Sequence, residues 1–131
     1  MWSLGCTDRD MNERVLRWVE GYRRAWDSNS PDDIRALFTE DATYHFDPYH
    51  EPLRGREAIV DGWLAAADAP GSYTFQWNLL AETEDVAFVR GETRYLEAPD
   101  YSNLWVIRFG DDSRASDFTD WWVEHELSGS N

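Results

Sequence analysis

The fold is decided by the stretch LFTEDATY at residues 37–44 and by LRGREAI at residues 53–59. The first stretch completes a short helix and continues into a strand. Pro48 and Pro52 bound a turn, and Gly55 precedes a new helix. A helix, a strand, a turn and a helix in so short a segment are compatible with few folds.

The residues before this segment predict two helices. Apolar residues at a spacing of three or four positions indicate a long helix beginning near residue 7 or 8. Its apolar face comprises Met11, Val15, Trp18, Tyr22 and Trp26. Ser30 followed by Pro31 is a typical helix N-terminus and predicts a short second helix. The residues of that helix expected to be buried are Ile34, Leu37 and Phe38.

The residues from position 42 onward predict a strand, a helix and a meander. The first strand covers residues 42–46, and the third helix carries Ile59, Trp63 and Ala66 at helical spacing. Four longer strands are expected over residues 73–81, 86–96, 101–109 and 115–123. No alternation of strands and helices or glycine-rich phosphate loop appears, so the class is α+β. We expect one domain over residues 1–131, with its core at about residues 8–126.

Charge excludes several classes of function. The chain has 26 acidic and 12 basic residues, a formal charge of −14, and every basic residue is an arginine. Without lysine, Schiff-base chemistry, pyridoxal phosphate attachment and a phosphate-loop lysine are excluded. The acidic surface predicts no binding to nucleic acid or anionic membranes, because phosphates require clustered cations. A neutral or cationic small molecule fits better.

The N-terminal region predicts a cytoplasmic protein. Cys6 is the single cysteine, so no disulfide forms within the chain. No cationic segment followed by an apolar run resembles a signal peptide, and no run is long enough to span a membrane.

Strand alternation predicts which side chains face the interior. Inward positions on the first three long strands include Phe75 and Trp77, the uncharged face around Gly91, and Asn103 with Trp105. On the last strand we assign Phe118, Asp120 and Trp122 to the interior. Burial between two aromatic residues disfavours a charged carboxylate and raises its pKa towards the range useful for acid or base catalysis. The alternative is that the face with Asp117, Thr119 and Trp121 lies inside and Asp120 is solvated.

These features resemble the SnoaL-like branch of the superfamily that contains nuclear transport factor two and ketosteroid isomerase. The resemblance implies a cone-shaped barrel, with three helices packed on a strongly curved, mainly antiparallel sheet. It places Tyr22 at the position of the isomerase tyrosine that donates a hydrogen bond to the developing oxyanion. It also places Trp63, Phe118 and Trp122 at pocket positions.

The same resemblance argues against ketosteroid isomerisation. Phe46 occupies the position of the catalytic aspartate, and Trp105 occupies that of the protonated aspartic acid. Asp47 restores the missing group only if a bulge turns it inward. Asp120 is similar to the interior acid of SnoaL-like polyketide cyclases.

The leading hypothesis is a cofactor-independent lyase, cyclase, hydratase or isomerase that acts on an apolar, carbonyl-bearing small molecule. Tyr22 and Asp120 are the predicted catalytic residues. The predicted substrate-binding residues are Trp18, Trp26, Tyr44, Phe46, Trp63, Phe75, Trp77, Asn103, Trp105, Phe118 and Trp122. The alternative is a non-catalytic ligand-binding or dimerisation module, and the sequence leaves open whether the chain is an enzyme.

A metal site is a further hypothesis, because His45, Asp47, His50 and Glu51 carry ligand groups close together in sequence. His45 and Asp47 share the strand face opposite Phe46, outside the expected cavity. The prolines at positions 48 and 52 explain the loop without an ion. We therefore predict no metal.

The outer face of the sheet predicts a homodimer. Phe88, Leu104, Val106 and Trp121 are apolar residues opposite the expected cavity face. An exposed apolar patch of this kind is unusual in monomers.

Overall fold

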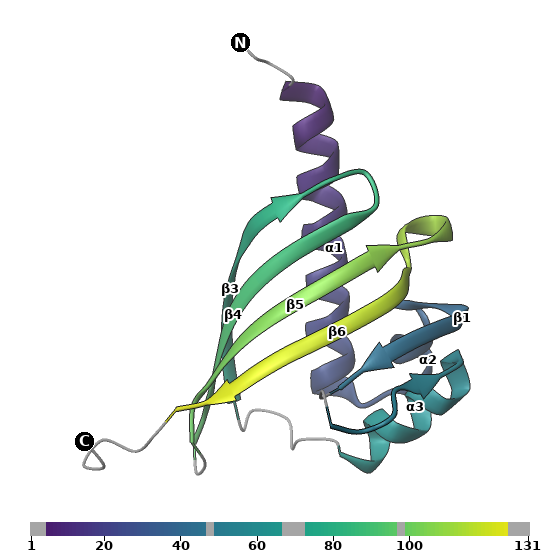
Figure 1. The fold of residues 1–131 in the computed structure, drawn as a ribbon, viewed down its shortest axis with the longest axis vertical. Helices are drawn as coiled ribbons and strands as arrows, with labels where there is room; N and C mark the ends of the chain where they lie inside the picture. The colour runs from purple at the N-terminus through teal and green to yellow at the C-terminus, as the bar shows by residue number, and fades with distance from the viewer. Residues whose placement is uncertain (1–4, 47–48, 67–72, 97–98, 126–131) are drawn as a thin grey trace.

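The structure is a computed structural model that describes residues 5–46, 49–66, 73–96 and 99–125, with side chains from Glu13 onward. Within these residues, three α-helices pack against a strongly curved sheet of six strands (Figure 1). The helices are α1 (Gly5–Ser28), α2 (Pro31–Arg35) and α3 (Arg56–Ala65). The strands are β1 (Phe38–His45), β2 (Leu53–Arg54), β3 (Tyr73–Glu82), β4 (Val86–Tyr95), β5 (Tyr101–Phe109) and β6 (Ala115–Glu124), with a 3₁₀ turn at Asp111–Ser113.

The sheet has the strand order β2-β1-β6-β5-β4-β3. Strands β3 to β6 form an antiparallel meander, as the sequence predicted. The exception to antiparallel pairing is β1, which lies parallel to β6, with Tyr44 beside Phe118. The α+β class and the mainly antiparallel, curved sheet are therefore confirmed.

The helix signals are confirmed, with shifts at the boundaries: α1 begins at Gly5 rather than near residue 7 or 8, and Leu37 and Ala66 lie just beyond the ends of α2 and α3. The Ser30 hydroxyl accepts a hydrogen bond from the backbone N–H of Asp33 at 3.4 Å, and Pro31 begins α2. Phe38, which we expected at the end of this helix, is instead the first residue of β1. It pairs with Ala115 of β6, a long-range partner that a local sequence pattern does not reveal. The side chains of Cys6 and Met11 lie outside the described part.

The core lies between α1 and the inner face of the sheet. On α1, Val15 and Val19 are fully buried, and Trp18 donates its indole N–H to the backbone oxygen of Leu37 at 2.9 Å. Ile107 and Phe118 are fully buried opposite them. Within the described helices, none has the length and apolar character that crossing a membrane requires.

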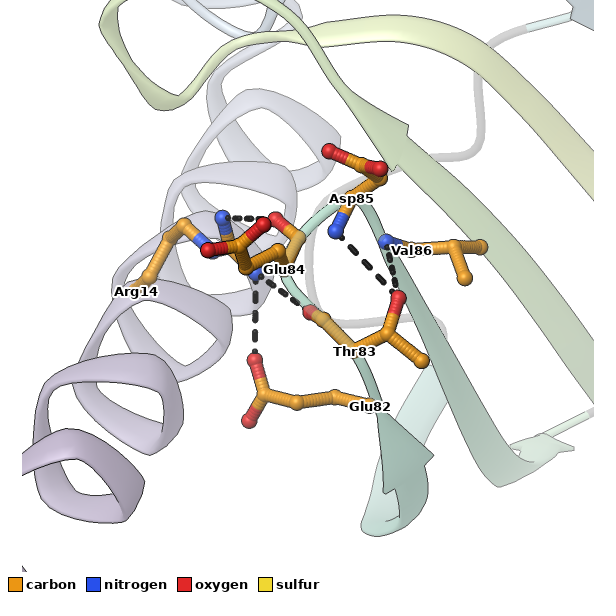
Figure 2. A network of polar contacts seen from close by, with 6 residues as sticks. All are labelled: Arg14, Glu82, Thr83, Glu84, Asp85 and Val86. Carbon is orange, nitrogen blue, oxygen red and sulfur yellow. Dashed lines mark hydrogen bonds and ion pairs between the residues drawn. The ribbon is translucent and has the colours of Figure 1, made fainter.

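Arg14 fixes α1 to the turn between β3 and β4 (Figure 2). Its guanidinium group donates to the backbone oxygens of Glu84 at 2.9 Å and Thr83 at 3.2 Å. It also forms an ion pair at 3.2 Å with the carboxylate of Glu82, whose side chain is 5% exposed. The same group lies 4.1 Å from the ring centre of Phe109 on β5. One arginine thus connects the helix to two parts of the meander.

Candidate active site

A cavity of about 620 Å³ lies between α1, α3 and the inner face of the sheet. Trp122 lines it and is 45% exposed, so the cavity opens to solvent beside β6. The described residues that line it are Tyr22, Trp26, Tyr44, Phe46, Leu53, Gly62, Trp63, Ala66, Thr93, Tyr95, Tyr101, Asn103, Trp105, Asp120 and Trp122.

Asp120 is the one carboxylate among these lining residues. It lies on β6 beside Trp105 of β5, and the side chain of Asn103 donates a hydrogen bond to its Oδ1 at 3.1 Å. The Oδ1 of Asn103 in turn accepts a hydrogen bond of 2.9 Å from the hydroxyl of Thr93. This chain of two hydrogen bonds fixes the orientation of the carboxyl group.

Burial raises the pKa of Asp120 from its ordinary value of 3.8 to about 6. The hydrogen bond from Asn103 opposes this rise, and so does the nearby indole N–H of Trp105. That N–H is buried and has no partner in hydrogen-bonding geometry among the described residues, so it acts on Asp120 through its dipole. A carboxyl group with a pKa of about 6 is able both to accept and to return a proton near neutral pH.

Two tyrosine hydroxyls lie close to this carboxylate. Tyr22 comes from α1 and Tyr44 from β1, and their hydroxyls lie close enough to influence each other's ionisation. Burial is the main cause that raises the pKa of each phenol, and the negative charge of Asp120 adds to it. Both groups therefore stay protonated at neutral pH and act as hydrogen-bond donors.

The arrangement suits proton transfer next to a polarised oxygen. Asp120 provides a group that takes up and releases a proton. The hydroxyls of Tyr22 and Tyr44 provide donors that stabilise negative charge on an oxygen atom. The aromatic side chains around these groups lower the local polarity and strengthen both effects.

Nine of the predicted site residues line the cavity. They are Tyr22 and Asp120, together with Trp26, Tyr44, Phe46, Trp63, Asn103, Trp105 and Trp122. The strand alternation that put Asp120 on the inner face agrees with this placement. The roles of these residues in binding and catalysis stay predictions.

Trp18 and Phe118 lie in the core and do not line the cavity. Trp18 is 4% exposed and Phe118 is fully buried, with their ring centres 5.1 Å apart. Trp18 lies one helical turn before Tyr22, and Phe118 lies two residues before Asp120. Both therefore support the cavity residues from beneath.

Phe75 and Trp77 also lie off the cavity, because α1 covers the inner face of β3. Trp26 of α1 stacks on Tyr73 of β3 with ring centres 3.9 Å apart. Phe75 is buried and stacks on Trp105 at 5.0 Å. Trp77 is half-buried against the core. β3 is the edge strand farthest from β1, so its inward residues meet the helix.

Six lining residues were not among the predicted site residues: Leu53, Gly62, Ala66, Thr93, Tyr95 and Tyr101. Thr93 and Tyr95 lie on the uncharged face of β4, so alternation contained the signal for them. Gly62 and Ala66 depend on how α3 is rotated. At Gly62 a Cβ atom would lie 2.6 Å from Leu53, which shows how closely α3 approaches β2.

His45, His50 and Glu51, the described residues among those considered for a metal site, are not among the residues that line the cavity. His45 is on the outer face of the sheet, with its Nε2 3.2 Å from the Oδ2 of Asp117. The ring of His50 stacks on Phe46 at 5.7 Å, and Asp47 lies outside the described residues. In the described ranges, no three His, Cys, Asp or Glu side chains are grouped in a way that could hold an ion.

Comparison with known proteins places this geometry in a family. The family model described as a SnoaL-like domain matches residues 19–123. No curated protein matches the chain.

Several solved structures share the fold. A protein of unknown function from Burkholderia xenovorans, similar to nuclear transport factor two, is 12% identical with a TM-score of 0.70, over 89% of this chain and 88% of that one. A ketosteroid isomerase-like protein from Erwinia carotovora is 14% identical with a TM-score of 0.63, over 83% and 93%. A steroid delta-isomerase from Pseudomonas aeruginosa is 18% identical with a TM-score of 0.60, over 88% and 82%. At these identities, the likeness concerns the fold alone.

Proposed function

The chain belongs to the SnoaL-like domain family, and on that premise we propose that it is a cofactor-independent enzyme acting on an apolar, carbonyl-bearing small molecule. One observation carries the proposal: Asp120, whose pKa burial raises to about 6, lines an open aromatic cavity beside the hydroxyls of Tyr22 and Tyr44. A purely structural domain gains nothing from an open cavity that contains a desolvated carboxylate.

The proposed reaction begins with removal of a proton next to the carbonyl group. The Asp120 carboxylate takes the proton, and the electron pair of the broken C–H bond moves onto the carbonyl oxygen. Tyr22 and Tyr44 donate hydrogen bonds to the resulting enolate oxygen. Return of the proton to another carbon of a conjugated enolate gives isomerisation. Attack of the enolate carbon on an electrophilic carbon of the same molecule gives ring closure, whereas departure of a group from the β carbon, which takes the proton from Asp120, gives elimination. Phe46, at the position of the catalytic aspartate of the ketosteroid isomerases, cannot transfer a proton. This argues against the reaction geometry of those enzymes.

A ligand screen followed by hydrogen exchange tests this function. Thermal shifts with a panel of ketones and other carbonyl compounds are expected to identify ligands, because a ligand at a hundred times its dissociation constant adds about 2.7 kcal/mol of stability. In deuterated water, NMR is expected to show that the protein accelerates exchange of the hydrogens next to the carbonyl of such a ligand. Binding without any acceleration would favour the non-catalytic ligand-binding alternative.

We propose in addition that the protein forms a homodimer through the outer face of the sheet. Leu104 is 37% exposed and Trp121 is 48% exposed, and these residues lie opposite each other on β5 and β6. Phe88 and Val106 form the next cross-strand pair. Burial of this patch between two chains would remove apolar area from water, at roughly 25 cal/mol per Å².

Sedimentation measures the dimer directly. At micromolar concentration in moderate salt, which screens the acidic charge, the wild-type chain is expected to sediment as a dimer. Trp121→Glu is expected to sediment as a monomer, because each partner would have to bury a new charge in the apolar patch. A wild-type chain that remains monomeric under these conditions would contradict this interface.

A further inference from the structure

The cavity contains a negative group, and no described lining residue carries the opposite charge. Of the fifteen described residues that line it, nine are aromatic, one is Asp120 and none is Arg, Lys or His. Burial, Asn103 and Trp105 shift the pKa of Asp120, and no cationic side chain of the described residues contributes to that shift. A buried carboxylate normally has a cationic partner, because leaving it unpaired is costly.

Three aromatic rings among the lining residues, those of Tyr95, Tyr101 and Trp122, form a corner. The ring centres of Tyr101 and Trp122 lie 5.7 Å apart at an interplanar angle of 73°. Those of Tyr95 and Tyr101 lie 5.9 Å apart at 86°. Trp122 is two residues after Asp120 on the same strand face. Rings at near right angles surround a rounded group better than a flat one.

The charge near this corner is also negative. The hydroxyl of Tyr101 lies 3.4 Å from a carboxylate oxygen of Glu124 and donates to it. Aromatic faces attract cations through their quadrupole, and alkylated ammonium groups are bound in proteins by several such rings together. The whole chain has a formal charge of −14, which favours the approach of a cation.

We propose that the molecule bound in this cavity carries a positively charged, alkylated amine, which contacts the rings of Tyr95, Tyr101 and Trp122 and is balanced by the carboxylate of Asp120. This inference deepens the proposed function and rests on it, because the same cavity and the same carboxylate serve both. The cation has a chemical consequence: it favours the ionised form of Asp120, the form that accepts a proton.

The side chains that face Asp120 are uncharged at neutral pH, so a change of cation affinity near pH 6 can be assigned to Asp120 itself. Tyr22 faces it from α1, Tyr44 faces it from β1, and both stay protonated at neutral pH. β5 contributes the uncharged side chains of Asn103 and Trp105. α3 and the residue that follows it contribute the uncharged residues Gly62, Trp63 and Ala66. Affinity for a cation is therefore expected to fall as the pH falls below about 6, where Asp120 becomes protonated.

Choline and its neutral carbon isostere, in which a tert-butyl group replaces the trimethylammonium group, separate charge from shape. Their binding can be measured side by side from the NMR methyl signal of each compound. At neutral pH, choline is expected to bind about tenfold more tightly than the isostere, which corresponds to a typical cation–aromatic attraction in a desolvated site. Equal affinities would overturn the inference.

Matched variants locate the effect within the cavity. Asp120→Asn is expected to reduce the preference for choline, because it removes the negative charge that balances the cation, whereas Asp117→Asn removes the same charge on the outer face and is expected to retain the preference. Trp122→Leu is expected to weaken choline binding, and Trp121→Leu, a change at the neighbouring outward residue, is expected to leave it unchanged. A preference that survives both Asp120→Asn and Trp122→Leu would place the cation elsewhere and overturn the inference.

The result is distinguishable from failure of the proposed function. If neutral carbonyl ligands bind and exchange hydrogen while choline shows no preference over its isostere, the cation inference fails and the enzyme proposal remains. If choline binds as expected and no carbonyl compound exchanges hydrogen, the cation inference is supported and the proposed reaction fails.

Discussion

Asp120→Asn is expected to slow hydrogen exchange of a bound carbonyl ligand by about 100-fold to 10,000-fold, the usual contribution of a positioned acid or base. The asparagine has the same shape and still accepts the hydrogen bond from Asn103, but it cannot take up a proton. The wild-type rate is expected to rise with pH through about 6, the pKa of Asp120 in the folded protein. NMR exchange rates of both proteins over this pH range test the prediction.

The same substitution is expected to stabilise the protein at neutral pH. The pKa of Asp120 is higher in the folded state, about 6, than its ordinary value of 3.8. The contribution of Asp120 to stability is thus fully present below pH 3.8 and is lost as the pH rises through about 6. Above that pH the charged carboxylate destabilises the fold. The carboxyl group is half-buried in an open cavity, so we expect Asp120→Asn to gain about 1 to 2 kcal/mol.

Urea unfolding at several pH values measures this gain. The difference between Asp120→Asn and wild type is expected to disappear well below pH 3.8, where the wild-type carboxyl group is protonated in both states. Asp117→Asn is the control, because it removes one charge from the outer face of the same strand.

An Asp120→Asn protein that exchanges hydrogen at the wild-type rate would exclude this residue as the catalytic group.

Phe118→Ala is expected to destabilise the protein by about 3 to 5 kcal/mol, the usual cost of removing a large buried aromatic side chain. Phe118 is fully buried and its ring lies within 6.4 Å of five other aromatic rings. Those rings belong to Trp18, Tyr22, Phe38, Tyr44 and Trp105. The truncation leaves a void that this many rigid rings cannot fill by small movements.

Trp122→Ala is the comparison on the same strand. Trp122 is 45% exposed, and its indole N–H donates a hydrogen bond of 2.9 Å to the backbone oxygen of Phe46. Its truncation is expected to cost about 1 kcal/mol, mainly through loss of that bond. Urea unfolding of both variants distinguishes a core residue from a cavity residue. Similar losses for the two would contradict the assignment of Phe118 to the core.

The sequence predicted the strands and their faces because both depend on local patterns. Residues 101–109 were expected as a strand and form β5 over that range. Alternation on the last strand placed Asp120 and Trp122 on the inner face, where they line the cavity. The period of two along a strand is enough to separate its two faces, provided that one residue can be assigned to the core.

The sequence did not predict which inward residues stay open to the cavity, because that depends on helix placement. Phe75 and Phe118 alternate in the same way as Asn103 and Asp120, yet both are buried. A ring clash would also accompany any side chain at Gly91, where a Cβ atom would lie 2.5 Å from the ring of Phe75. The small and the large residue of such a pair lie on different strands. The sequence around either residue therefore does not reveal the other.

The parallel pairing of β1 with β6 also has a consequence for how the chain folds. Strands β3 to β6 are joined by short connections, so their hairpins form from neighbouring residues. β1 reaches β6 only after the chain between Phe38 and Ala115 has closed into one large loop, and such non-local steps are slow. Tyr44 lies on β1 and Asp120 on β6. The two groups therefore meet late, and a folding intermediate with an intact meander is expected to contain the acid without the hydroxyl beside it.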